Sequence, residues 1–203
     1  YERVSAVAPM LALPQRTAGA GRAAREGILS SAALVDLYAE VYAVEDFEGP
    51  AAQSAQLLQT AYVGTSAEDR LAAMKSIWSG DQPADYSGLV LTAYAAARMP
   101  VNAAFEADAA QLIASMLTAG LDRNALRWAS VVEQGSEGWA LLALADPAQD
   151  SSAGAGALDS FFDNDTSMEQ RKSQFLLAGL AGLGRVEQSA VAGLSDQLSI
   201  DLG

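Results

Sequence analysis

The chain has 203 residues, of which 51% are hydrophobic, and a formal net charge of −13. This length and apolar content predict a packed core rather than a disordered chain, because enough apolar surface is available for burial. The acidic balance argues against nucleic acids and anionic membranes as main partners, since phosphate groups bind to basic surfaces.

The sequence contains neither cysteine nor histidine. The absence of cysteine excludes disulfides, thiolate nucleophiles and thiolate metal sites. The absence of histidine removes the commonest general base and the commonest zinc ligand. We therefore expect no cofactor, and a metal site in this chain would have to be built from carboxylates.

No segment approaches the roughly 18 uninterrupted apolar residues that a transmembrane helix needs, so we expect no transmembrane segment. The chain begins with Tyr1 rather than methionine, and arginine outnumbers lysine ten to two. These features lead us to expect part of a larger protein from a bacterium with a GC-rich genome. The sequence does not fix the compartment, although it favours the periplasm or cell envelope, and the oligomeric state stays open.

The residue composition predicts an all-α fold. Alanine, the best helix former, is abundant, isoleucine is rare, and no alternating run of β-branched residues suggests a strand. We expect about eight to ten short helices arranged as a helical-hairpin array. A degenerate α-solenoid and an irregular bundle both fit this pattern.

The first half of the chain contains clear helix boundaries. Residues 1–20 lack a period and predict an arm or linker, followed by a single domain over 21–203. Ser30 or Ser31 predicts the start of a helix over 32–42. Pro50 suits the first turn of a helix that runs to about residue 62, and Gly64 is expected to end it in the left-handed C′ position.

Three further helices are expected in the middle of the chain. Thr65 and Ser66 offer N-caps for a helix that ends at Gly80. Pro83 predicts the start of the next, which stops before Pro100. Asn102 then begins a long amphipathic helix that Gly120 ends.

The last third contains shorter elements. Asp122 is expected to cap one helix, and Ser136 with Glu137 to open an apolar one over 139–145. Residues 148–156 predict a flexible loop. The remaining predicted helices are three: one around 157–162, one that Asp165, Thr166 or Ser167 caps, and a final one over 185–198.

Three predicted helices are apolar on every side, over 89–97, 139–145 and 175–183. A helix without a polar face must be buried all round, so these segments predict an inner layer beneath amphipathic neighbours. Gly179 and Gly182 are expected to allow close helix packing, and their replacement by leucine to overpack the core. The segments end at intervals within the range of helical-hairpin repeats, although no consensus aligns across them.

Four carboxylates form the densest acidic cluster: Asp159, Asp163, Asp165 and Glu169. In an all-α chain the residue types are similar to the aspartate-rich Mg²⁺ sites of isoprenoid synthases, but the Asp-Asp-x-x-Asp motif of those enzymes is absent. An EF-hand also fails, because Met168 stands where glycine is required. The cluster is a candidate metal site, and helix capping is the alternative explanation.

A second candidate site combines Arg123, Arg127 and Trp128. The two arginines lie one helical turn apart, near a predicted helix N-terminus, with an indole beside them. Such a group could bind a carboxylate or phosphate. The alternative is a solvated arginine face with the tryptophan in the core.

No motif identifies a reaction: Gly-x-Ser-x-Gly, Walker and dinucleotide-binding patterns are all absent. We therefore expect a non-enzymatic interaction or scaffold module that binds another protein or a cell-envelope polymer. The alternative is an all-α enzyme domain with a carboxylate, Mg²⁺-type site around Asp159–Glu169. A domain that only supports a catalytic part elsewhere in the gene product is a third hypothesis.

Overall fold

The structure is a computed structural model that describes residues 5–79, 86–146 and 154–186, and residues 191, 193 and 195. The described residues form α-helices and short 3₁₀ helices and contain no strand, which confirms the all-α prediction. No helix among them is both long enough and apolar enough to span a bilayer.

The chain divides into two compact units, each described by itself below. The first unit contains residues 1–100 and 114–124, and the second contains residues 101–113 and 125–203. The sequence predicts a single domain over 21–203, and this range contains most of both units. The predicted arm over 1–20 is partly wrong, because helix α2 (Leu13–Arg25) begins inside it and buries Gly19 and Ala20.

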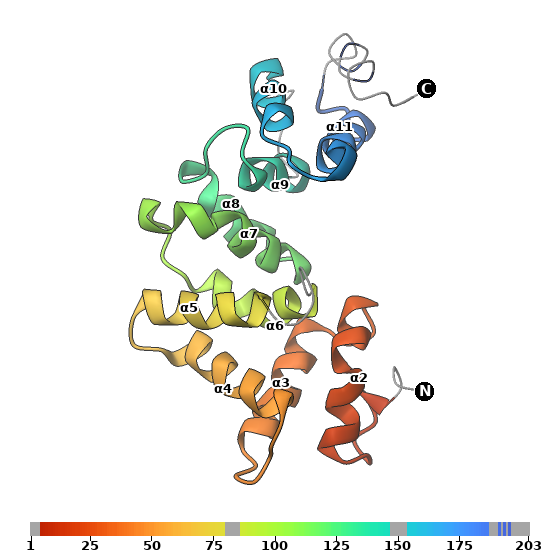
Figure 1. The fold of residues 1–203 in the computed structure, drawn as a ribbon, viewed down its shortest axis with the longest axis vertical. Helices are drawn as coiled ribbons and strands as arrows, with labels where there is room; N and C mark the ends of the chain where they lie inside the picture. The colour runs from red at the N-terminus through yellow and green to blue at the C-terminus, as the bar shows by residue number, and fades with distance from the viewer. Residues whose placement is uncertain are drawn as a thin grey trace. The chain divides into compact units, whose positions relative to one another are not determined.

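Five helices of the first unit follow one another as hairpins (Figure 1). After α2, each neighbouring pair packs side by side, and α6 also packs against α2, α3 and α4. Apolar side chains from α2, α3, α4 and α6 share one core. The helices after α2 are α3 (Ser31–Tyr42), α4 (Pro50–Val63), α5 (Ala67–Trp78) and α6 (Tyr86–Ala97).

The helix starts of this unit agree with the local capping signals. The hydroxyl of Ser30 accepts a hydrogen bond from the amide of Ala33, and the hydroxyl of Ser66 accepts one from Asp69. Pro50 is the first residue of α4. The predicted start at Pro83 and the predicted end at Gly80 lie outside the described residues.

Gly64 ends α4 for a different reason from the one predicted. Its φ of −52° lies outside the left-handed region, so the expected C′ conformation is wrong. A Cβ on this residue would instead lie 2.6 Å from the carbonyl oxygen of Thr60. Glycine is required here by the close approach of backbone to backbone.

Helix α6 is largely buried, with Val90, Leu91 and Ala93 each at most 4% exposed. It is not buried on every side, although its sequence predicts this, because Tyr94 is 37% exposed. It also contains a fully buried hydroxyl, that of Thr92. This hydroxyl accepts a hydrogen bond from Nε1 of Trp78 at 2.7 Å and lies 2.9 Å from the hydroxyl of Ser115. A buried polar network therefore ties α5, α6 and the start of the next segment of the first unit together.

The segment over 102–130 alternates 3₁₀ and α-helical turns, and the boundary between the units crosses it twice. Asn102 caps a 3₁₀ helix, η1 (Ala103–Asp108), rather than the long α-helix expected. The apolar face predicted from periodicity is buried, since Leu112, Ile113 and Met116 are inaccessible. The remaining elements here are α7 (Ala109–Thr118), α8 (Asp122–Leu126) and η2 (Arg127–Ser130).

Among the described residues of the second unit, three α-helices share an apolar core, and a 3₁₀ turn without buried residues precedes the last of them. Leu158 and Phe162 of α10 pack in this core with Leu177 and Leu180 of α11, and all four are nearly inaccessible. The elements are α9 (Glu137–Ala145), α10 (Ala155–Asp163), η3 (Met168–Gln170) and α11 (Arg171–Gly182). Residues 148–153 of the predicted flexible loop and most of the predicted final helix lie outside the described residues.

Helix α11 is not buried on every side, so the prediction for 175–183 is wrong. Leu176, Leu177 and Leu180 face the core, but Phe175 is 76% exposed and Leu183 is 53% exposed. The exposed face also includes Gly182, where a Cβ would have no described atom within 4 Å. The overpacking expected at Gly182 is therefore wrong.

Gly179 does face a neighbouring helix, as predicted. A Cβ there would lie 2.7 Å from Cδ2 of Leu144 on α9. A run of apolar residues thus overstates burial, because it does not show how many sides of the helix have neighbours.

Candidate functional site

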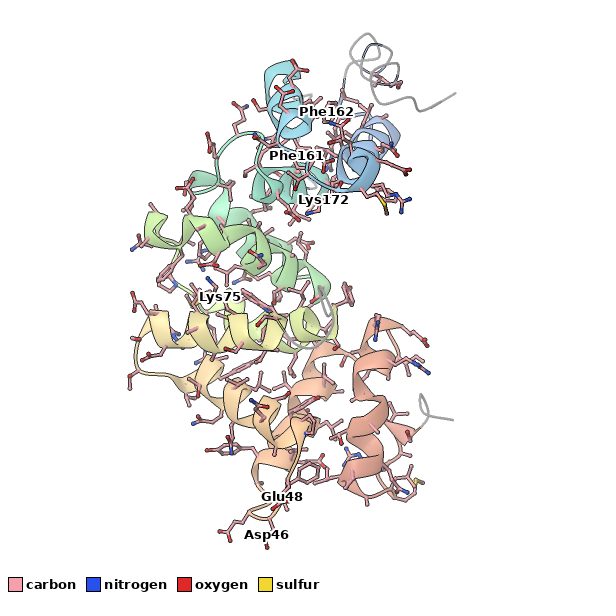
Figure 2. The ribbon with its side chains drawn as sticks, viewed as in Figure 1. Asp46, Glu48, Lys75, Phe161, Phe162 and Lys172 are labelled. Carbon is pink, nitrogen blue, oxygen red and sulfur yellow. The ribbon has the colours of Figure 1, made fainter. Side chains whose placement is uncertain are left out.

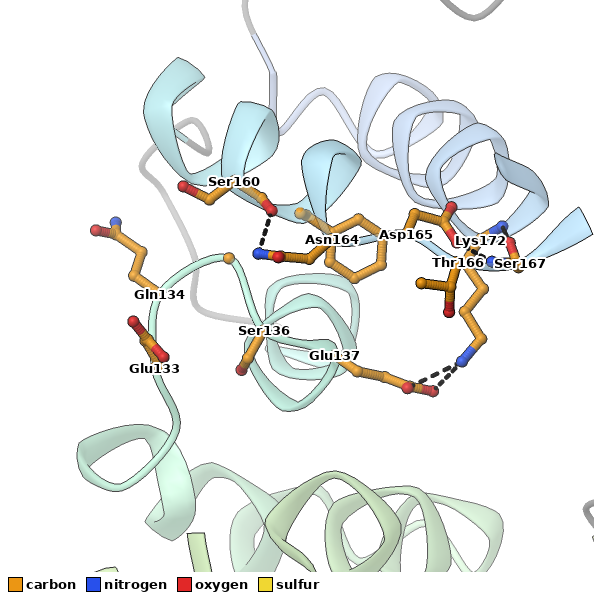
Figure 3. A pocket seen from close by; sticks show the side chains of 12 residues that line it. Glu133, Gln134, Ser136, Glu137, Ser160, Asn164, Asp165, Thr166, Ser167 and Lys172 are labelled. Carbon is orange, nitrogen blue, oxygen red and sulfur yellow. Dashed lines mark hydrogen bonds and ion pairs between the residues drawn. The ribbon is translucent and has the colours of Figure 1, made fainter. Parts of the chain in front are cut away.

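A cleft in the second unit has a volume of about 640 Å³. Three segments form it: the loop before α9 with the first turn of α9, the end of α10 with the loop after it, and the start of α11 (Figure 3). We call it the polar cleft. Its lining consists of Glu133, Gln134, Gly135, Ser136, Glu137, Ser160, Phe161, Asn164, Asp165, Thr166, Ser167 and Lys172.

The wall formed by the loop before α9 is held by a glycine and a capping serine. Gly135 has a φ of +82°, and a Cβ there would lie 2.7 Å from Cβ of Ser160 and 2.9 Å from the carbonyl oxygen of Ala157. The loop can approach α10 this closely only because residue 135 has no side chain. Ser136 then begins α9, as predicted, by accepting a hydrogen bond from the amide of Trp139.

The opposite wall, residues 164–167, is fixed by the carboxylate of Asp165. Oδ1 accepts a hydrogen bond from the amide of Ser167, and Oδ2 accepts bonds from the amide and the hydroxyl of Ser173. Partial burial raises the pKa of this carboxyl, but these hydrogen bonds outweigh it and lower the pKa to about 2. Asp165 is therefore an ionised structural group that joins the loop to α11.

Two consecutive non-glycine residues that follow this wall, and do not line the cleft, adopt the left-handed region. Glu169 has a φ of 57° and Gln170 a φ of 51°, which costs about 1–3 kcal/mol at each residue. Side-chain hydrogen bonds hold the kink: Nε2 of Gln170 donates to the carbonyl of Phe162, and Nε2 of Gln174 donates to the carbonyl of Glu169. The sequence analysis missed this kink, since no glycine or proline marks it.

One ion pair closes an end of the polar cleft. Nζ of Lys172 lies 2.9 Å from both carboxylate oxygens of Glu137, and both side chains are about half exposed. Figure 3 shows this pair at one end of the cleft, with Glu133 and Gln134 at the other end and Asn164 between them. Such an exposed pair contributes less than about 1 kcal/mol to stability, so its place in the cleft matters more than its energy.

Several polar groups in the cleft remain available to a ligand. Among the described residues, no hydrogen bond or ion pair engages the side chains of Glu133, Gln134 or Thr166, and all three are exposed. The amide nitrogen of Asn164 donates to the carbonyl of Ser160, which leaves its Oδ1 free to accept. The cleft therefore offers both donors and acceptors that folding has not satisfied.

The predicted metal cluster is not assembled in the described residues. No three Asp or Glu side chains in the part of the chain that the structure describes lie close enough to share a metal ion. Asp159 and Asp163 are exposed on α10. Asp165 is bound to Ser167 and Ser173, and Glu169 pairs with Arg171 at 3.2 Å.

The second predicted site is also not brought together as a ligand site. Trp128 is 1% exposed and belongs to the core, so its indole is not accessible to a bound anion. Arg123 and Arg127 are both exposed. These positions fit the alternative of solvated arginines beside a core tryptophan.

Comparison with known proteins finds no family model, no curated protein and no solved structure that matches this chain significantly.

Proposed function

We propose that this chain is a non-enzymatic binding module whose polar cleft takes a short segment of a neutral, hydroxyl-rich saccharide, as found in cell-envelope polymers. The observation that carries the proposal is the set of unsatisfied polar side chains in a cleft of about 640 Å³. This volume falls within the range of about 300–1,000 Å³ that is typical of ligand pockets.

The residue types of the lining favour a saccharide over other small ligands. Sugar hydroxyls both donate and accept hydrogen bonds, and they match amides, hydroxyls and carboxylates, which together offer both roles. The cleft has amides at Gln134 and Asn164, and its hydroxyls include that of Thr166. Phe161 supplies a small apolar area for the carbon face of a ring.

The charge of the cleft argues against an anionic ligand. Glu133, Glu137 and Asp165 supply three carboxylates against the single ammonium of Lys172, which gives a net charge of −2. Lys172 is already paired with Glu137. Phosphate, sulfate or uronate groups would meet an uncompensated negative potential, so a neutral polymer fits better than an acidic one.

Isothermal titration of the full chain tests the proposal with short neutral oligomers of glucose, mannose and N-acetylglucosamine. We expect at least one of them to bind. We expect Gln134→Ala with Asn164→Ala to weaken that binding about tenfold, as the loss of one or two hydrogen bonds of ~0.5–1.5 kcal/mol each implies. Gln111→Ala is the matched control, because Gln111 is an exposed glutamine of the same unit outside the cleft.

Two results would overturn this function. The first is that none of the neutral oligomers binds. The second is that the variant in the cleft binds as tightly as Gln111→Ala does. A fragment of polygalacturonate serves as the anionic comparison, and tighter binding of it would contradict the charge argument.

The all-α enzyme domain with a carboxylate site around Asp159–Glu169 remains a separate proposal. Thermal unfolding in Mg²⁺, Mn²⁺ and Ca²⁺ distinguishes the two, because a metal that binds the folded state raises its stability. If one of these ions raises the melting temperature of the wild type but not of Asp163→Ala, the enzyme proposal gains support. If the saccharide proposal is right, each ion should change the melting temperatures of the wild type and of Asp163→Ala equally.

A further inference from the structure

A second concave surface lies in the first unit, between α3 and α4. This groove of about 180 Å³ is mainly apolar, and its lining includes Val35, Tyr38, Tyr42, Leu58, Tyr62 and Val63. We call it the tyrosine groove.

The groove is built from a second apolar face of α3. Leu34, Leu37 and Val41 face the core and are each 1% exposed. Val35, Tyr38 and Tyr42 form a separate face at helical spacing, beside the core face. The fold leaves part of the groove uncovered. Tyr42 of α3 is 53% exposed, and Val63 of α4 is 61% exposed.

The helical hairpin that forms the groove is strongly acidic. Residues 31–63 contain five carboxylates, Asp36, Glu40, Glu45, Asp46 and Glu48, and no lysine or arginine. Within the described part of the first unit, only Glu40 among these five forms an ion pair, with Arg16 of α2.

The three remaining carboxylates after Tyr42 gather at one end of the groove. Glu45, Asp46 and Glu48 lie on the turn between α3 and α4 and are exposed. Figure 2 labels Asp46 and Glu48 at this turn. No hydrogen bond or ion pair within the described residues engages them. An apolar groove thus ends at a patch of three unpaired negative charges.

We propose that the tyrosine groove docks a basic amphipathic helix of a partner protein. Apolar side chains on one face of that helix would fill the groove at i, i+3 and i+7 positions, and lysine or arginine side chains would meet Glu45, Asp46 and Glu48. Tyrosine is enriched at such binding surfaces because its ring is large, rigid and amphipathic.

The same charges disfavour other occupants. A second copy of this chain has a net charge of −13, so the acidic hairpin would repel it unless it offered a basic patch. The same hairpin of the second copy, residues 31–63, offers no such patch. An anionic membrane surface would be repelled for the same reason. The inference is independent of the saccharide proposal, because it concerns a different unit and a different chemistry.

Fluorescence anisotropy on the full chain tests the proposal with two labelled synthetic helices, one of leucine and lysine and one of leucine and glutamate. We expect the leucine–lysine helix to bind and its affinity to fall as salt is added, since salt screens exposed charges over a Debye length of ~10 Å at 0.1 M. The leucine–glutamate helix should not bind. Equal binding of both helices would refute the charge complementarity.

Two pairs of variants locate the binding. Tyr42→Ser is expected to weaken binding of the leucine–lysine helix about tenfold, in the range of an interface aromatic. Val44→Ser, an exposed apolar residue that does not line the groove, is its control and should leave binding unchanged. If both variants bind alike, the groove is not the binding surface.

A second pair of variants tests whether the three carboxylates on the turn attract the basic helix. Combined Glu45→Lys, Asp46→Lys and Glu48→Lys should abolish binding of the leucine–lysine helix. The control makes the same change of charge at Glu106, Asp159 and Asp163, which are exposed in the second unit. An equal loss in both triple variants would show general attraction to an acidic protein and overturn the proposal. Self-association that Tyr42→Ser removes would assign the groove to a second copy instead.

Discussion

Gly135 supports one wall of the polar cleft, and replacing it with alanine should destabilise the second unit. Its φ of +82° is unfavourable for an L-residue, which costs about 1–2 kcal/mol. The new Cβ would also lie 2.7 Å from Cβ of Ser160 and 2.9 Å from the carbonyl oxygen of Ala157. Because neither contact is with the end of a flexible side chain, the loop must move, at a further cost of about 1–3 kcal/mol.

Denaturant-induced unfolding, followed by circular dichroism, measures this effect. We expect Gly135→Ala to lower the free energy of unfolding by about 2–5 kcal/mol in total. Gly184→Ala is the control in the same unit, because its φ is +66° but no described atom lies within 4 Å of the added Cβ. It should therefore lose only the conformational part, about 1–2 kcal/mol.

The comparison of these two variants gives a clear refutation. If Gly135→Ala costs no more than Gly184→Ala, the close approach of the loop to α10 does not exist as described. The geometry assigned to the polar cleft would then be wrong as well.

Three further predictions concern buried or hydrogen-bonded groups. Thr92→Val should lower the free energy of unfolding by about 1–3 kcal/mol, because Nε1 of Trp78 loses its acceptor; Thr60→Val, whose hydroxyl bonds only within its own helix, should have little effect in the same denaturation assay. Burial of the Tyr62 side chain raises the pKa of its phenol to about 12, and Tyr94 adds a smaller effect. The folded state therefore favours the neutral phenol. Stability should fall as the pH rises from 10.0 towards 12, and less steeply in Tyr62→Phe. The carboxylate of Asp165 has a lowered pKa, so its contribution should be complete above pH 3.8, decline towards pH 2 and be absent in Asp165→Asn, as acid titration of unfolding would show.

The features that sequence reasoning predicted correctly are local ones. Ser30, Ser66 and Ser136 each begin a helix because an N-cap needs only a hydroxyl and an amide three residues later. The amphipathic face of Leu112, Ile113 and Met116 was also predictable, since helical periodicity shows which residues share a buried side.

The features that it missed depend on contacts between distant segments. Phe175 lies in an apolar run but is exposed, because a sequence does not show which sides of a helix have neighbours. Two hydrogen bonds hold Glu169 and Gln170 in the left-handed region: Gln170 donates to the carbonyl of Phe162, and Gln174 donates to the carbonyl of Glu169. No turn motif in the sequence marks either bond. Asp165 was among the residues predicted to cap a helix, but the N-cap of η3 is Ser167 and that of α11 is Gln170. The bond of Asp165 to Ser173 was not predicted.

The polar cleft itself could not be predicted, because its lining comes from three segments that meet only in the folded unit. Glu133 and Gln134 precede α9, Asn164 ends α10, and Lys172 begins α11. Read separately, each is an ordinary solvated residue. Only the close approach that Gly135 allows makes them walls of one cleft.

The central claim is that the polar cleft binds a neutral saccharide, and mapping amide chemical shifts by NMR during titration with the oligosaccharide that binds tests it most directly. The account predicts that the perturbed amides are confined to residues 133–137, 160–167 and Lys172. Perturbations centred elsewhere in the chain, or no change at saturating ligand, would contradict it.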